Sequence, residues 1–206
     1  MRVSSALETG AEGETFRNDD WYGQVLGAVR FADCVFVDVD LSESMTVGTT
    51  FESCTFHGVR FNGSTHRTTA FVGCEFRRAS FFTATLDGCK LTGSGFAECT
   101  MRPLTVIGGA WQAVSLRRHN LAGVDLTAVD LRDADLSMSD LTDSVLAETR
   151  LEGALVRETD FSRADLRGAK LDGVDLSSAT LDKTRIDLQA AVMLAELAGA
   201  VVDLGE

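Results

Sequence analysis

The sequence predicts an all-β solenoid made of four-sided coils, with twenty residues per coil, that ends in a short carboxy-terminal capping helix. Three observations lead to this fold class. An apolar residue recurs at every fifth position except Thr46 and His66. This five-residue register runs without insertion from Phe16 to Ile186. Like residues also recur at intervals of twenty. A period of five fits neither the 3.6-residue period of a helix nor the 2.0-residue period of a flat strand. A repeating coil whose sides are five residues long accounts for it.

Residues 1–15 precede the repeating frame and show no apolar period. They lack the apolar core of roughly 7 to 15 residues that a signal peptide needs. No apolar run in the chain approaches the roughly 18 residues of a membrane span. We therefore expect a flexible amino-terminal leader on a cytoplasmic protein that does not bind membranes.

The repeating segment covers residues 16–186, and its register is clearest in its carboxy-terminal half. Alternate residues of an extended chain point to the same side, so each large apolar residue and the small residue two positions earlier should share one interior. The other three positions of each five are mostly polar and should face outward. The most regular run of inward positions is Leu121, Leu126, Leu131, Leu136, Leu141 and Leu146, most of them preceded by Asp.

The number of residues in one coil follows from residues that repeat at twenty. Phe occupies positions 16, 36, 56, 76 and 96, and Cys occupies positions 34, 54 and 74. All five cysteines lie at the small inward position, so we expect free thiols that pack as small apolar groups. Thr46 and His66 are the two polar residues at the large inward position and are also twenty apart. These two polar residues could line a ligand pocket, or they could mark a bulge or an outward turn of the chain. We favour the bulge or outward turn.

The five-residue motif A(D/N)LXX, seen here as AGVDL, DADL and RADL, resembles that of the pentapeptide-repeat family. The strings CEFRRASFFTATLDGCKLTGSGFAECTMRPLTV, RRHNLAGVDL and TRIDLQAAVMLAELAGAVVDL are similar to those of the gyrase-protecting group that includes MfpA and Qnr proteins. The resemblance covers about residues 30 to 204. It implies a right-handed quadrilateral β-helix, a homodimer joined at the carboxyl end, and a role in protecting DNA gyrase from fluoroquinolones.

The period of five ends at Ile186, and residues 187–206 have the pattern of a helix and tail. Asp187 suits the N-cap, residues 188–198 form a largely apolar segment, and Gly199 suits the stop. One side of this helix can cover the open end of the last coil. The remaining apolar side should form a two-fold dimer interface. We expect that interface to include Leu188, Ala191, Val192, Leu194, Ala195, Leu197, Val201 and Val202.

The net charge of −12 is unevenly distributed along the chain. Residues 1–53 carry a net charge of −7, residues 54–118 carry +5, and residues 119–206 carry −10. In the last of these segments the carboxylates repeat with the coils, at a density of the same order as the phosphates of a DNA duplex. A protein that binds phosphates could therefore bind this rod in place of DNA. The predicted partner-binding surface consists of Asp125, Asp135, Asp140, Asp160, Asp165 and Asp175.

No arrangement of residues typical of an enzyme is present in the sequence. His57, His66 and His119 fall on unrelated repeat positions, and there is no nucleophile elbow, phosphate-binding loop or dinucleotide fingerprint. We expect a non-enzymatic DNA mimic that needs no cofactor or metal, binds a type II topoisomerase, namely gyrase, and does not itself bind nucleic acid. The alternative is an interaction scaffold for an unrelated cytoplasmic protein.

Overall fold

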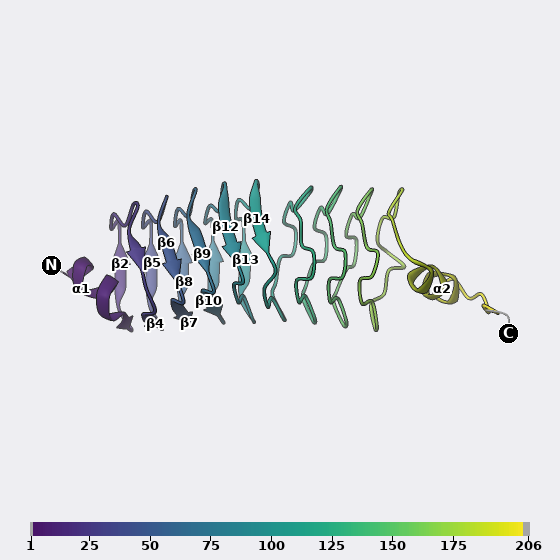
Figure 1. Cartoon of the computed structure of the whole chain (residues 1–206), viewed down its shortest axis with the longest axis horizontal. Helices are drawn as coiled ribbons and strands as arrows, with labels where there is room; N and C mark the ends of the chain where they lie inside the picture. Colours follow the sequence, from purple (N-terminus) through teal and green to yellow (C-terminus); the bar gives the residue numbers. More distant parts are fainter. Residues whose placement is uncertain (1, 204–206) are drawn as a thin grey trace.

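The computed structural model describes residues 2–203 and is a straight β-solenoid rod with one helix at each end (Figure 1). Backbone pairs join residues twenty apart, from Ala11 with Phe31 to Asp165 with Arg185. Twenty residues therefore make one coil, and the predicted right-handed quadrilateral β-helix is confirmed. Residues 204–206 of the predicted carboxy-terminal segment lie outside the described residues.

The rod has four faces, which we number by the first inward residue that each contributes. Face 1 begins at Phe16, face 2 at Trp21, face 3 at Leu26 and face 4 at Phe31. Face 1 holds β2 (Thr15–Arg17), β5 (Val35–Val37), β8 (Thr55–His57), β11 (Glu75–Arg77) and β13 (Gly95–Ala97). Face 3 holds β3 (Val25–Leu26), β6 (Met45–Val47), β9 (Thr65–Arg67), β12 (Ala84–Asp87) and β14 (Leu104–Ile107). Face 4 holds β1 (Ala11–Glu12), β4 (Arg30–Ala32), β7 (Thr50–Glu52) and β10 (Ala70–Val72), and face 2 pairs through single bridges.

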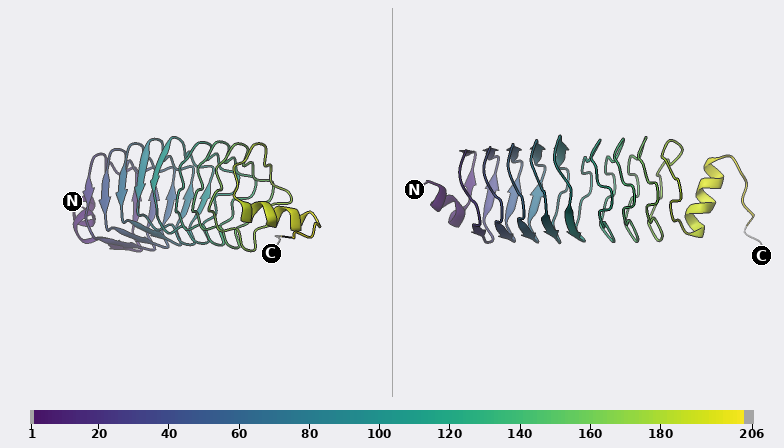
Figure 2. Two further views of the ribbon diagram at one scale, coloured as in Figure 1. Left: turned by 45° about the vertical axis from the view of Figure 1, so that its right-hand side comes forward. Right: turned by 90° about the horizontal axis from the view of Figure 1, so that it is seen from above.

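Beyond β14 the coils continue without further strands among the described residues, as the view from above shows (Figure 2). Each side here closes a tight turn, as where the Val124 N–H donates to the Leu121 carbonyl at 3.1 Å. Coil-to-coil hydrogen bonds persist, for example from the Leu126 N–H to the Val145 carbonyl at 2.7 Å. The carboxy-terminal half is therefore as regularly bonded as the strand-bearing half.

The interior is filled by the residues of the five-residue frame. Phe rings of face 1 stack in a column, with centroids 4.8 Å apart between Phe36 and Phe56 and 4.7 Å apart between Phe56 and Phe76. The cysteines carry no disulfide, and their thiols donate to backbone carbonyls, as Cys34 does to Ala32 at 3.2 Å. Burial raises the pKa of Cys89 to about 12, so that thiol stays protonated near neutral pH.

Thr46 and His66 do not turn outward, and in this respect the predicted bulge or turn was wrong. Thr46 lies within β6 and His66 within β9, paired in register, and both side chains are buried. The Thr46 hydroxyl lies 2.7 Å from Nδ1 of His66, and the Ser64 hydroxyl lies 2.8 Å from Nε2. These mutual hydrogen bonds satisfy the polar groups, so the repeat continues without distortion.

Residues 2–12 differ from the predicted flexible leader over residues 1–15. They form α1 (Arg2–Thr9) and β1, and β2 already begins at Thr15. Ala6 is buried and Leu7 packs against the core at the open amino-terminal end, so α1 covers strand edges that would otherwise be exposed. Gly10 links α1 to β1 with φ +77°, and a Cβ there would lie 2.0 Å from the Arg30 carbonyl oxygen. Only glycine allows the helix to join the coil at this point.

Candidate partner-binding surface

The predicted surface acids all occupy the position just before an inward residue, and this position gives them a local structural role. One carboxylate oxygen accepts a hydrogen bond from the backbone N–H two residues later. The donor is Thr127 for Asp125, at 2.9 Å, and Ser162 for Asp160, at 2.8 Å. Asp therefore stabilises the turn that begins each side, as short polar side chains do in Asx-turns. The second carboxylate oxygen is left for other contacts.

Asp140 and Asp160 are the two predicted acids that the structure places side by side. They pair directly across neighbouring coils of face 2, between Asn120 and Thr180. No Arg or Lys nitrogen of the described residues lies within 4.0 Å of either carboxylate. Hydrogen bonds from Ser162 lower the pKa of Asp160, so this carboxyl stays ionised at neutral pH. Like charges in register cost stability. Arg163 acts on Asp160 only from beyond ion-pair distance and is itself paired with Asp143.

Asp165 differs from the other five predicted acids because arginines neutralise it. Its Oδ2 lies 2.7 Å from Arg167 and 3.3 Å from Arg185, and the residue is only 8 % exposed. The hydrogen bond from Arg167 lowers the pKa of Asp165 to about 2. Asp130, which precedes an inward residue of face 4, is paired in the same way with Arg132 at 2.7 Å. The acids of faces 3 and 4 are therefore partly neutralised within the chain.

Asp135 and Asp175 lie on face 1, adjacent to face 2, and neither makes an ion pair with a described residue. Leu155 lies between them along the rod, pairs with Asp135 and is 59 % exposed. The exposure of Leu155 was not predicted. The five-residue register does place it just before an inward residue, where side chains face outward. Asp125 lies apart on face 3, separated from Asp165 by Val145. The unpaired predicted acids thus concentrate on faces 1 and 2.

The predicted dimer residues lie on α2 (Leu188–Leu197) and just after it, beyond the last coil (Figures 1 and 2). Ala190 is buried against the coil, and Met193 and Leu194 pack partly on it. Val192, Leu194, Ala195 and Val202 are half-buried, whereas Leu188, Ala191, Leu197 and Val201 are exposed. The helix therefore covers the end of the rod with one side and leaves an apolar side uncovered.

Replacing Asp187 with Ala should loosen α2 from the rod. Asp187 accepts from the Ala190 N–H at 2.9 Å as the N-cap and from the Gly168 N–H of the preceding coil at 2.9 Å. We expect Asp187→Ala to destabilise this end by about 1 to 2 kcal/mol and to speed amide hydrogen exchange in α2. Asp187→Asn keeps an acceptor and should stay close to the unchanged protein. Equal exchange rates in the two variants would show that the cap does not hold the helix.

The structure is a β-solenoid of five-residue repeats. Each coil has four faces of five residues, every fifth side chain fills the lumen, and the exterior is acidic. The family model for pentapeptide repeats, in eight copies, matches residues 112–146 and 144–182. The five-residue period of these matched segments also runs through the rest of the solenoid, from Phe16 to Ile186. The comparison with curated protein sequences found no significant match.

Solved structures of QnrB1, described as a plasmid-mediated fluoroquinolone resistance protein, are similar to this chain in fold. A trypsin-treated variant superposes with a TM-score of 0.84 at 18 % identity, covering 95 % of this chain and 98 % of that one. The full-length protein gives a TM-score of 0.61 at 17 % identity, covering 92 % and 99 %. These values confirm the predicted likeness in fold to the Qnr group.

Two features of residues 2–203 bear on the kind of site present. No helix in this range is long and apolar enough to cross a membrane. No three His, Cys, Asp or Glu side chains of the range lie close enough together to hold a metal ion.

Proposed function

We propose that this protein is a DNA mimic that binds a type II topoisomerase, DNA gyrase, and protects it from poisons such as fluoroquinolones or alters its response to them. The observation that carries the proposal is a pair of carboxylates, Asp140 and Asp160, that lie in register on face 2 of a rigid rod and make no ion pair with a described residue. A cationic partner would relieve the repulsion between these two carboxylates on binding.

The geometry of the rod supports such a partner. Neighbouring coils lie about 4.8 Å apart, so carboxylates in adjacent coils present charge at intervals comparable to those of a nucleic acid backbone. A protein surface that holds DNA through Arg and Lys would bind these carboxylates and release counterions, as it does on DNA. The binding should therefore weaken as salt concentration rises.

The comparisons support the choice of target. QnrB1 is described as a fluoroquinolone resistance protein and has a similar fold over nearly its whole length. The sequence resemblance to the MfpA and Qnr group implies gyrase as the enzyme concerned. The exposed apolar side of α2 supports a two-fold dimer, which would double the length of the rod and place the two acidic halves at its centre.

The experiment is a gyrase supercoiling and drug-cleavage assay with the Asp140→Asn/Asp160→Asn variant. Asn removes the charge and keeps the turn, because Asn120 already fills this position on face 2 and accepts from the Ala122 N–H at 3.1 Å. Each exposed ion pair with a partner contributes up to about 1 kcal/mol, so we expect about a tenfold higher concentration of the variant to be needed for the same effect.

The matched control is Asp20→Asn, the same change on the same face far from the acidic half. Asp20 also caps a turn, accepting from the Tyr22 N–H at 3.0 Å. We expect this variant to act on gyrase as the unchanged protein does. If neither the unchanged protein nor the variants affect gyrase or its drug response, the proposed DNA mimicry is wrong. The chain is then better described as a scaffold for an unrelated partner.

A further inference from the structure

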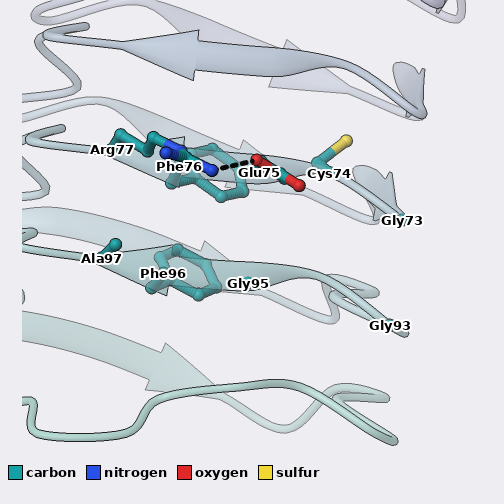
Figure 3. A pocket seen from close by; sticks show the side chains of 9 residues that line it. All are labelled: Gly73, Cys74, Glu75, Phe76, Arg77, Gly93, Gly95, Phe96 and Ala97. Atoms are coloured by element: carbon teal, nitrogen blue, oxygen red, sulfur yellow. Dashed lines mark hydrogen bonds and ion pairs between the residues drawn. The ribbon is translucent and has the colours of Figure 1, made fainter.

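A shallow hollow lies on face 1 near the middle of the rod, where the acidic character of the chain is interrupted (Figure 3). It has a volume of about 310 Å³ and is formed by β11 and β13 with the turns before them. Gly93, Gly95 and Ala97 leave its floor without large side chains, and the Glu75–Arg77 ion pair borders it on one side. The floor is thus open to a ligand beside an arginine.

Arg77 borders this hollow, and three further arginines lie in the two coils that flank its floor. Arg77 pairs in register with Ala97, and Ser115 pairs with Gly95, so Arg117 lies in the coil on the other side of the floor. Arg78 and Arg118 follow directly at the corner between faces 1 and 2. The two flanking coils are two strand spacings apart, or about 9.6 Å. Arg117 and Arg118 reach toward Met138 and Arg78 reaches toward His57, each in the next coil away from the floor. These long, exposed side chains would have to turn back over the floor to converge on one ligand.

Three of these arginines have no carboxylate partner within 4.0 Å among the described residues. Arg117 and Arg118 donate to the sulfur of Met138 at 3.4 Å and 3.3 Å, and Arg78 contacts His57. Arg77 alone is paired, with Glu75 at 3.0 Å. The chain has a net charge of −12, yet these three neighbouring arginines make no ion pair with its carboxylates. Their role is therefore not explained by ion pairing within the chain.

We propose that Arg77, Arg78, Arg117 and Arg118 form a binding site for a compact phosphate-rich anion laid over the Gly95–Ala97 floor. All four residues are arginines, whose planar forks bind phosphate oxygens in pairs, which lysine does not do. The ligand must be compact because the segments on either side carry net charges of −7 and −10, which repel a long polyanion such as duplex DNA. The proposal does not depend on binding to gyrase.

Glu98 lies at the corner between the coils of Arg78 and Arg118 and makes no ion pair with a described residue. Its carboxylate opposes an anion bound by its neighbours. Removing its charge should therefore strengthen anion binding, a gain that a damaged fold would not produce.

The test is isothermal titration of the full chain at low salt with inorganic tripolyphosphate, and with ATP in a parallel titration. Each charged hydrogen-bonding partner is worth roughly tenfold in affinity, so we expect Arg77→Gln/Arg117→Gln to bind tripolyphosphate about a hundredfold more weakly. Glu98→Gln should bind several-fold more tightly. The control Arg157→Gln, at the same repeat position on face 1 but paired with Glu158 at 3.0 Å, should leave the affinity unchanged.

Equal affinities for tripolyphosphate and ATP would support recognition of the phosphates alone, and tighter binding of ATP would support a ring over the glycine floor as well. The proposal is wrong if the unchanged protein does not bind tripolyphosphate, or if Arg157→Gln weakens binding as much as the double variant. Tighter binding of an aspartate-rich peptide than of either phosphate ligand would also overturn it.

Discussion

Replacing Phe56 with Ala is expected to lower the free energy of unfolding by about 3 to 5 kcal/mol, the range measured for large aromatic residues in protein cores. Phe56 is completely buried on β8. Its ring stacks on Phe36 and Phe76 with interplanar angles of 8° and 6° and meets Phe51 edge-on. In a solenoid each coil is stabilised by its neighbours, so a cavity at Phe56 weakens the contacts of three coils.

The measurement is equilibrium denaturation in guanidinium chloride followed by far-UV circular dichroism. Phe82→Ala is the matched control, since Phe82 is 49 % exposed on the outside of the rod, and we expect it to change stability by less than about 0.5 kcal/mol. Phe56→Leu, which puts the usual inward residue of the carboxy-terminal half into the column, should cost an intermediate amount. Similar losses in Phe56→Ala and Phe82→Ala would contradict a lumen filled by every fifth side chain.

The main architecture could be predicted from the sequence because one side chain in five determines it. The phenylalanines at intervals of twenty reveal the coil length, because like side chains stack on like when parallel strands pair in register. The end of the solenoid could also be predicted from the sequence. Asp187 is the N-cap, α2 begins at Leu188, and Gly199 follows with φ +87°. In each case a local rule and the fold lead to the same residue.

The amino-terminal cap and the lumen polar cluster could not be predicted in the same way. Residues 2–9 contain only three apolar residues at helical spacing, Val3, Ala6 and Leu7, which is too short a pattern to predict a helix, and α1 is held where Ala6 and Leu7 meet the first coil. Thr46 and His66 looked like interruptions because each has polar atoms at an apolar position. Their compatibility depends on the coil register and on Ser64, whose hydroxyl can be placed only once the turn around it is known.

For the acidic surface, the sequence identifies the carboxylates but not their ion pairs. Asp165 and Asp140 occupy the same repeat position, yet Asp165 is neutralised by Arg167 and Arg185 whereas no Arg or Lys nitrogen of the described residues lies within 4.0 Å of Asp140. The choice of partner depends on which of several close cations a side chain reaches. The contribution of Asp165 to a DNA-like surface is correspondingly smaller than that of Asp140 or Asp160.

Stability should fall as pH decreases from about 6.5 toward 3 because of His66, by about 4 to 5 kcal/mol in all. Burial in the lumen lowers the pKa of His66 from 6.5 to about 3. The unfolded chain, with the ordinary pKa, therefore binds a proton across this range before the folded chain does. Folding loses stability as pH falls through the window, and the full stability is present above pH 6.5.

The hydrogen bonds around His66 satisfy both nitrogens of its neutral ring. The Ser64 hydroxyl donates to the Phe61 carbonyl at 2.7 Å, so its oxygen accepts from Nε2–H. Nδ1 then accepts from the Thr46 hydroxyl, which lies 2.6 Å from the Thr69 hydroxyl and accepts from it. Protonating Nδ1 would turn the Thr46 hydroxyl to donate to Thr69 instead, and it would place a charge in the lumen, where burial penalises the charged form.

The effect of His66 can be isolated by measuring unfolding free energies between pH 6.5 and pH 4. In this range His66→Leu should lose a slope of about 1.4 kcal/mol per pH unit, whereas His57→Leu, which removes a half-buried histidine on the outside of face 1, should keep it. The acids with lowered pKa values, such as Asp130 and Asp165, also lose stability as pH falls, but they are present in both variants and cancel in the comparison. The pKa of His119 is also lowered by burial, but this residue is present in both variants and cancels in the comparison. The same slope in His66→Leu and in the unchanged protein would mean that the lumen admits enough water to hold a charged imidazole.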